Sequence, residues 1–178
     1  DMNAQLNALA DRYVEAALQR TPELAYFTGL PAPTHARLAD NSQQALAEWR
    51  AFEDALYGEL QAIDPAKLGQ REWIAWGGLK ELLEASRNLS VCRSELWQSV
   101  NHMFSWHLQM SFVAARQPVA TPKERAAALQ RWASLPQYID TEITNLEQGL
   151  EMDYSAARPV AVAMLFTLGI NQTSGGPA

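Results

Sequence analysis

Apolar residues recur every three or four positions along almost the whole chain, which is the spacing of one face of an α-helix. The clearest stripe consists of Leu46, Trp49, Phe52, Leu56, Leu60 and Ile63. Caps, prolines and glycines divide the pattern into helices predicted at residues 3–20, 22–29, 42–63, 70–89, 93–116, 122–134, 135–151 and 158–168. The sequence therefore predicts an all-α fold, a multi-helix bundle of about seven or eight helices.

Three places in the chain mark helix boundaries or irregularities. Thr121 and Glu124 form the capping-box pattern that starts a helix. Pro136 has no backbone N–H, so it must break or kink the helix that contains it. Gly77 and Gly78 lie in the middle of the fourth predicted helix, where each glycine costs about 1 kcal/mol relative to alanine. Such a pair is typical of a close approach between helices or of a bend.

The 178 residues are enough for a single helical domain, or form an N-terminal fragment of a larger protein. The formal net charge is −6, and the three lysines, Lys67, Lys80 and Lys123, lie far apart in the sequence. We expect no nucleic-acid partner, because binding to phosphates needs clustered cationic side chains. The longest apolar stretch, 160–168, is much shorter than a bilayer is thick, so no membrane span is expected.

The helix predicted at 158–168 is apolar on almost every side, with Val160, Val162, Met164, Leu165, Phe166 and Leu168. A helix of this kind needs neighbours all round it. The residues that follow, 171–178, are polar and rich in glycine. We therefore expect this helix to be covered by a missing C-terminal portion, or by self-association or a partner protein.

The residue patterns of common catalytic and metal sites are absent from the sequence. It contains no His-Glu-x-x-His or Glu-x-x-His pair, no Gly-Lys of a phosphate-binding loop and no Gly-x-Ser-x-Gly element. The single cysteine, Cys92, excludes an internal disulfide and a thiolate zinc site. The sequence therefore predicts no catalytic residue, no metal ligand and no cofactor in this chain.

The best candidate for a binding surface is the helix predicted at 93–116. A polar stripe about 120° wide on this helix contains Glu95, Gln98, Asn101, His102, Ser105 and Gln109. Apolar residues fill most of the remaining circumference, which is typical of a central helix in a bundle. We interpret Asn101, His102 and Gln109 as candidate ligand-facing residues. The alternatives are a buried polar network and a plain surface face.

A further candidate is His107, which lies in the apolar arc of the same predicted helix, about 140° from His102. The two rings therefore cannot bind one small metal ion together. A single histidine on an apolar face is usually a core residue with satisfied hydrogen bonds. The alternative is a ligand-facing or catalytic group whose pKa is lowered by burial.

The sequence holds six tryptophans, a high number for its length. Five of them follow the apolar stripes of predicted helices, namely Trp49, Trp73, Trp76, Trp97 and Trp132. We therefore expect them to pack in the core rather than form a binding platform, and we expect Trp73 and Leu82 to face inward.

Three segments of the sequence are similar, in the same order, to segments of one large bacterial family. The first contains Thr-Pro-Glu-Leu-Ala-Tyr-Phe-Thr-Gly-Leu over residues 21–30. The second, at 131–150, contains Leu-Pro-Gln-Tyr-Ile-Asp and Asn-Leu-Glu-Gln-Gly-Leu, and Arg158-Pro-Val follows. The chain thus resembles the N-terminal part of the proteins known as domain of unknown function 885.

The resemblance implies a longer, predominantly helical protein that is exported, with a periplasmic, secreted or lipid-anchored location. Such proteins carry a His-Glu-x-x-Pro-Gly-His element in their C-terminal half, like helical zinc metallopeptidases. This chain has no counterpart of that element. The resemblance therefore implies that zinc and catalysis belong to the full-length protein, and that this chain is inactive alone.

Two functions are consistent with these features. In the first, the chain is the N-terminal helical portion of a metallopeptidase-like hydrolase, where it forms a scaffold and one wall of a groove for substrates such as peptides. In the second, it is a non-enzymatic helical interaction or ligand-binding module that completes its core by association.

Overall fold

The computed structural model describes residues 1–103 and 106–169. Within them it contains eight α-helices and no strand, which confirms the all-α fold. The helices are α1 (Met2–Arg20), α2 (Leu24–Thr28), α3 (Gln43–Gln61), α4 (Gln70–Leu89), α5 (Trp106–Arg116), α6 (Pro122–Ala133), α7 (Leu135–Glu151) and α8 (Arg158–Thr167). Short 3-10 turns are η1 (Pro65–Lys67), η2 (Ser90–Cys92) and η3 (Ser94–Leu96).

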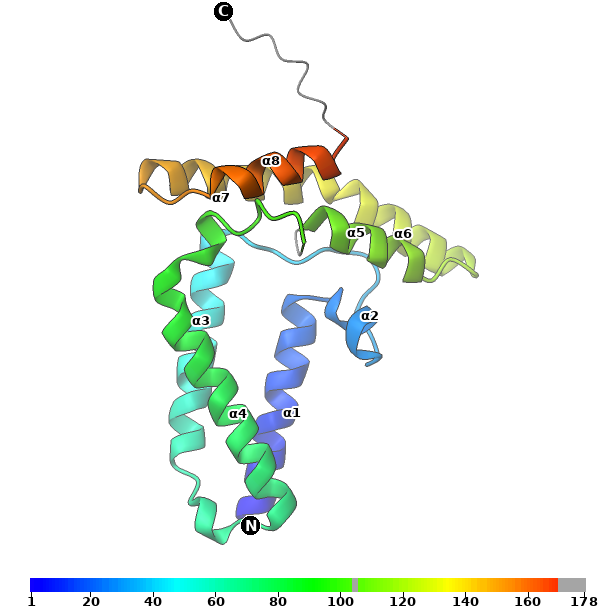
Figure 1. Cartoon of the computed structure of the whole chain (residues 1–178). Coiled ribbons are helices and arrows are strands. Elements are labelled where there is room, and N and C mark those ends of the chain that lie inside the picture. Colours follow the sequence, from blue (N-terminus) through cyan, green and yellow to red (C-terminus); the bar gives the residue numbers. More distant parts are fainter. Residues whose placement is uncertain (104–105, 170–178) are drawn as a thin grey trace, which may run out of the picture.

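The first half of the chain forms a three-helix bundle of α1, α3 and α4, which stand side by side in Figure 1. Each helix turns its apolar stripe toward the other two, as the periodicity of the sequence predicts. The resulting core consists of Leu6, Leu9, Leu56, Leu60, Ile63, Leu79 and Leu83. This bundle is therefore held mainly by the burial of aliphatic side chains.

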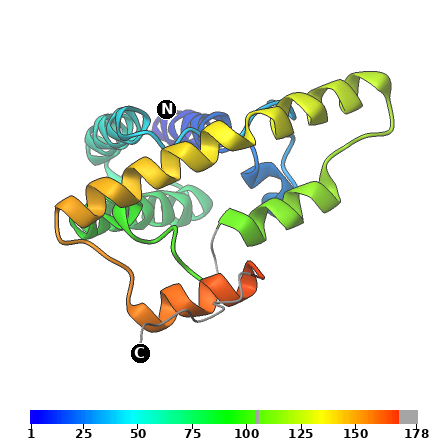
Figure 2. The same ribbon diagram turned by 90° about the horizontal axis from the view of Figure 1, so that it is seen from above.

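The second half forms what we call the upper layer, comprising α5, α6, α7 and α8, which lies across one end of the three-helix bundle (Figures 1 and 2). It contacts the rest of the chain where α7 packs on η3. Gly149 of α7 makes this packing possible, because a Cβ atom at this position would collide with the carbonyl of Leu96.

Arg131 of α6 joins the upper layer to the loop that precedes α3. Its guanidinium is fully buried and donates to the carbonyl oxygens of Arg37 (3.0 Å) and Thr34 (3.1 Å). It also donates to the Tyr26 hydroxyl (2.7 Å) and to Gln117 Oε1 (2.6 Å). All four acceptors are neutral, so the buried charge is stabilised by oriented dipoles rather than by a carboxylate.

The helix predicted at 93–116 is wrong in its first half, because only Trp106–Arg116 forms α5. Arg93 has a φ of +45°, in the left-handed region that interrupts a right-handed helix. Further on, the Asn101 side chain accepts a hydrogen bond from the N–H of Met103 (2.7 Å), a local bond that competes with helix formation. The polar stripe expected on one continuous helix is therefore wrong as well for its described residues, and Ser105 lies outside them.

The expected inward position of two α4 side chains is also wrong, since Trp73 is 57% exposed and Leu82 is exposed. The reason is that α4 packs mainly on α1 and α3, which leave its other face uncovered. Gly77 and Gly78 have open space around them, so they permit no close helix approach here. The other tryptophans of the apolar stripes are partly buried, namely Trp49, Trp76, Trp97 and Trp132.

The apolar helix α8 is uncovered in the described part of the chain. None of its residues is buried, and Phe166 is 79% exposed. In Figure 2 α8 lies along the outer side of the upper layer. Within residues 1–103 and 106–169, no helix has both the length and the apolar character that crossing a bilayer requires.

Candidate functional site: a polar cavity at the junction of the two regions

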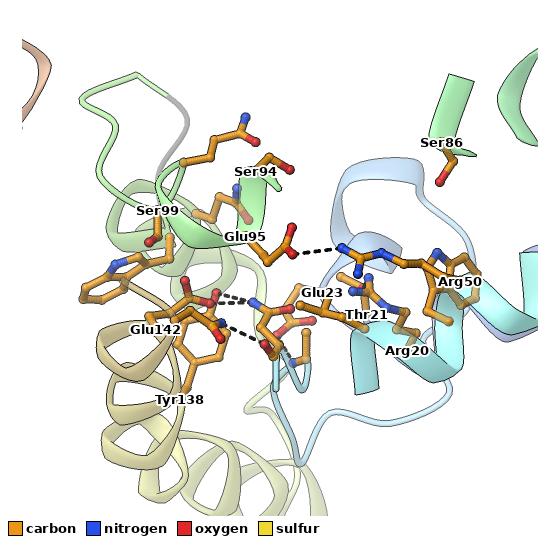
Figure 3. A pocket seen from close by; sticks show the side chains of 18 of the residues that line it. Arg20, Thr21, Glu23, Arg50, Ser86, Ser94, Glu95, Ser99, Tyr138 and Glu142 are labelled. Carbon is orange, nitrogen blue, oxygen red and sulfur yellow. Dashed lines mark hydrogen bonds and ion pairs between the residues drawn. The ribbon is translucent and has the colours of Figure 1, made fainter. Parts of the chain in front are cut away.

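A cavity of about 590 Å³ lies where the three-helix bundle meets the upper layer, and we call it the polar cavity. Its walls come from the junction of α1 and α2, the first half of α3, the end of α4, the segment around η3, and one face each of α5 and α7 (Figure 3). This volume falls within the range of small-molecule binding sites.

Arg20, the last residue of α1, lies in the wall of the polar cavity. Its guanidinium sits 5.4 Å from the centre of the Trp49 ring, and Nη1 reaches the Thr21 hydroxyl at 3.4 Å. Nε is buried and has no hydrogen-bond partner. Burial lowers the pKa of Arg20, although the charge of Glu53 opposes this effect. Arg20 forms no ion pair with any described residue.

Glu23 follows Pro22 and immediately precedes α2. Its side chain lines the polar cavity and is only 5% exposed. Its Oε1 accepts a hydrogen bond from the backbone N–H of Ala39 (2.8 Å). Its Oε2 is buried and has no hydrogen-bond partner. One oxygen of this buried carboxylate therefore lacks the hydrogen bond that would offset its burial.

Two further buried carboxylates line the polar cavity and receive hydrogen bonds from neutral donors. Glu53 accepts from the Ser86 hydroxyl (2.6 Å), and Glu142 accepts from the Asn41 amide (2.7 Å). Burial raises the pKa of Tyr138, and the charges of Glu142 and Glu23 raise it further. Glu23 and Glu142 therefore both act electrostatically on Tyr138, which also lines the cavity.

The fourth carboxylate, Glu95, is the one with cationic partners. It accepts from Arg50 of α3 (3.0 Å) and from Arg93 (2.6 Å). Burial, the largest single effect, would raise the pKa of Glu95, but these two hydrogen bonds, a backbone hydrogen bond and the charge of Arg50 together keep the pKa below its usual value. This arrangement ties the η3 segment to α3 and fixes that wall of the cavity.

The most informative feature of the polar cavity is its set of unpartnered polar atoms. Four buried side-chain atoms in the described residues lack a hydrogen-bond partner, and three of them line this cavity: Arg20 Nε, Glu23 Oε2 and Ser99 Oγ. Buried polar atoms are rarely left unpaired in proteins, because desolvation is then uncompensated. Their convergence on one cavity is what a site for a polar ligand requires.

The residues expected from the sequence to face a ligand do not gather at this cavity. Gln109 lines it, whereas Asn101, His102 and His107 lie outside its walls. His102 carries the fourth unpartnered atom, Nδ1. A ligand-facing role for these residues stays a prediction.

His107 is partly buried rather than enclosed in the core. Its Nε2 lies 3.2 Å from the hydroxyl of Thr167, so it bridges α5 and α8. Burial lowers its pKa, in the direction expected for a histidine on an apolar face.

The residues that matter most here were overlooked in the sequence because they fit ordinary helix-end roles. A cation in the last turn of a helix, like Arg20, and an acid at the start of the next, like Glu23, both complement the helix dipole. Ser99 lies in the segment that was expected to be helical. The adjacency of Arg20 and Glu23 around a Thr-Pro turn was the only available signal.

Metal ligands of the kind that the family resemblance implies are not gathered in the described residues. Among them, no three His, Cys, Asp or Glu side chains lie together in a way that could hold a metal ion. The described residues therefore do not fit a zinc site.

The fold and the site together define an all-α protein with a polar, ligand-sized cavity between a three-helix bundle and a crossing helical layer. The family model described as "Bacterial protein of unknown function (DUF885)" matches residues 22–173, and the chain belongs to that family. Comparison with curated proteins gives no match. Comparison with solved structures gives none either.

Proposed function

We propose that this chain is the substrate-binding helical portion of a bacterial metallopeptidase-like hydrolase, with the polar cavity as part of one wall of the substrate groove. The observation that carries the proposal is the convergence of Arg20 Nε, Glu23 Oε2 and Ser99 Oγ, all buried and unpartnered, on a single cavity. In this role the chain binds and orients substrate, and the reacting groups lie outside its described residues.

Two further features support this role. The sequence resembles the N-terminal part of longer proteins that carry a metallopeptidase-like motif. The uncovered apolar helix α8 is also suited to packing against additional helices of the same protein, because exposed apolar side chains such as Phe166 favour association.

The test uses the natural protein with whatever sequence follows residue 178. Zinc content and hydrolysis of a mixed peptide library are measured on this protein and on two variants, Glu23→Gln and Glu15→Gln. We expect hydrolysis, with Glu23→Gln raising KM at little cost in kcat, because the residue binds substrate without reacting. The exposed Glu15 is the matched control and should change neither value. Absence of both zinc and turnover would overturn the proposal.

A second candidate function is favoured by α8 itself. Here the chain is a non-enzymatic helical module whose apolar α8 completes its core by self-association or by binding a partner helix. Phe166 and Val162 are the exposed side chains that such an interface would bury. Light scattering over a range of concentrations tests this function, and a monomer at all concentrations would contradict self-association.

A further inference from the structure

Several charged side chains in the walls of the polar cavity form no ion pair. Its walls hold the carboxylates of Glu23, Glu53, Glu95 and Glu142 and the guanidiniums of Arg20 and Arg50. Arg50 and Glu95 pair with each other. Among the described residues, Arg20 forms no ion pair with a carboxylate, although the charge of the nearby Glu53 acts on it, and Glu23, Glu53 and Glu142 form no ion pair with a cation.

The carboxylate of Glu142 and the guanidinium of Arg20 lie in different parts of the cavity. In the view of Figure 3, Ser99 and Glu142 lie on one side, Arg20 and Arg50 lie on the other, and Glu23 lies toward the middle. Arg20 and Glu23 are close in sequence, yet they form no ion pair, and each keeps an unpartnered atom. The cavity thus offers a free donor and a free acceptor of opposite charge.

We infer that the polar cavity binds a small amino-acid-type zwitterion, a ligand that carries a primary ammonium and a carboxylate. The carboxylate binds the Arg20 guanidinium and satisfies Nε. The ammonium binds Glu23 Oε2 and faces Glu142. This inference rests on the substrate-binding role proposed above and specifies the chemistry of what is bound.

Ligands of a single charge fit these walls less well. A purely anionic ligand on Arg20 would stand beside three carboxylates that have no cationic partner. A purely cationic ligand on Glu23 would leave the partly buried Arg20 guanidinium without an ion-pair partner and its Nε without a hydrogen bond. A zwitterion satisfies both sides with one molecule, and the shared chemistry is found in free amino acids and in short peptides.

The first test needs no variant. Isothermal titration calorimetry at pH 7 compares triglycine, N-acetyl-triglycine, triglycine amide and free glycine as ligands of the chain. We expect triglycine or glycine to bind, and we expect each capped peptide to bind about tenfold or more weakly, because each lacks one charge-assisted hydrogen bond. The stronger binder of the two zwitterions distinguishes a peptide site from a free amino-acid site.

Variants then connect each charge to its partner. Glu23→Gln keeps an oxygen that can accept from the Ala39 N–H. We expect this variant to bind triglycine as weakly as the natural chain binds N-acetyl-triglycine. Acetylation of the peptide should then cause no further loss of affinity in the variant. Arg20→Gln should bind triglycine as weakly as the natural chain binds triglycine amide, and amidation of the peptide should cause no further loss of affinity in this variant. Glu15→Gln on the exposed face of α1 is the control and should bind all four ligands unchanged.

Two results would overturn the inference. One is the absence of binding by both zwitterions, and the other is equal binding of capped and uncapped peptides. Neither result would change the outcome of the zinc and hydrolysis measurements described above. Failure of this inference and failure of the proposed function are therefore distinguishable.

Discussion

The three-helix bundle and the upper layer are built from different interactions. The bundle buries a continuous set of leucines and one isoleucine contributed by all three helices. The upper layer meets the rest of the chain through apolar contacts, such as the stacking of Phe112 on Phe27, and also through many polar ones. The polar contacts include those of Arg131 and those of Asn145 with Gln43 (2.8 Å) and with the Asn41 carbonyl (2.9 Å). Its last helix, α8, buries no residue at all.

This difference explains where the polar cavity lies. Burial of apolar side chains is non-directional, so the side chains of an apolar core pack closely and leave few voids. Hydrogen bonds are directional, so a junction held by them keeps polar side chains at fixed positions, and some of their atoms can be left without partners. The cavity with its three unpartnered atoms occurs at this junction and not inside the bundle.

The largest expected effect is at Arg131, the polar anchor of the upper layer. Replacing Arg131 with Met leaves buried oxygens of Arg37, Thr34 and Gln117 without their donor, and we expect a loss of about 4 kcal/mol in the free energy of unfolding, at roughly 1–3 kcal/mol for each such group. Urea denaturation measures it. Lys123→Met, on the exposed face of the same helix, should stay within about 0.5 kcal/mol.

Hydrogen exchange shows whether this loss is confined to the upper layer. In Arg131→Met, we expect amide protection to fall in α6 and α7 and to persist in α1, α3 and α4. Equal loss of protection in all of these helices would mean that the three-helix bundle and the upper layer unfold as one cooperative unit.

The counterpart in the bundle is Leu56, which is fully buried in the apolar core. Leu56→Ala removes aliphatic contacts and leaves a cavity, so we expect a loss of about 3 kcal/mol in the free energy of unfolding. Urea denaturation measures the loss, and hydrogen exchange should now show it in α1, α3 and α4. The control is Leu129→Ala, because Leu129 is exposed in the upper layer and its truncation should cost little.

The same contrast decides what could be predicted from the sequence. The bundle helices were predicted closely, because their buried leucines repeat at helical spacing and periodicity reports burial directly. The segment before α5 was not predicted correctly, because its path depends on the left-handed backbone conformation of Arg93 and on local hydrogen bonds of polar side chains. The spacing of apolar residues gives no information about either. Arg20 and Glu23 escaped notice because their roles depend on a cavity formed by distant parts of the chain.

A smaller effect is expected where η3 packs on α7. Gly149→Ala introduces a Cβ against the Leu96 carbonyl, and we expect a loss of about 2 kcal/mol in the free energy of unfolding from overpacking. Gly77→Ala, in open space on α4, should instead stabilise the protein by about 0.5–1 kcal/mol through helix propensity. Urea denaturation of both variants measures the two changes in the free energy of unfolding. Changes of the same sign would contradict the expectation.

The smallest expected effect is the pH dependence of the upper layer and the loop beneath it. Burial lowers the pKa of His35, and the charge of Arg131 lowers it further, while burial alone lowers that of His107. Each histidine therefore binds fewer protons when folded than when unfolded, where its pKa is about 6.5. The stability they contribute is present above that value and is lost as the pH falls through the folded-state pKa.

The three-helix bundle has no histidine in α1, α3 or α4, and its pKa-shifted carboxylates, Glu59 and Glu84, titrate at lower pH. Between pH 7.5 and about 5.5, we therefore expect amide protection, corrected for intrinsic exchange, to fall near His35 and His107 and to hold in the bundle. An NMR titration of the histidine ring protons tests the cause directly. Ordinary pKa values for both rings, or an equal loss of protection in α3, would show that these histidines do not destabilise the upper layer selectively.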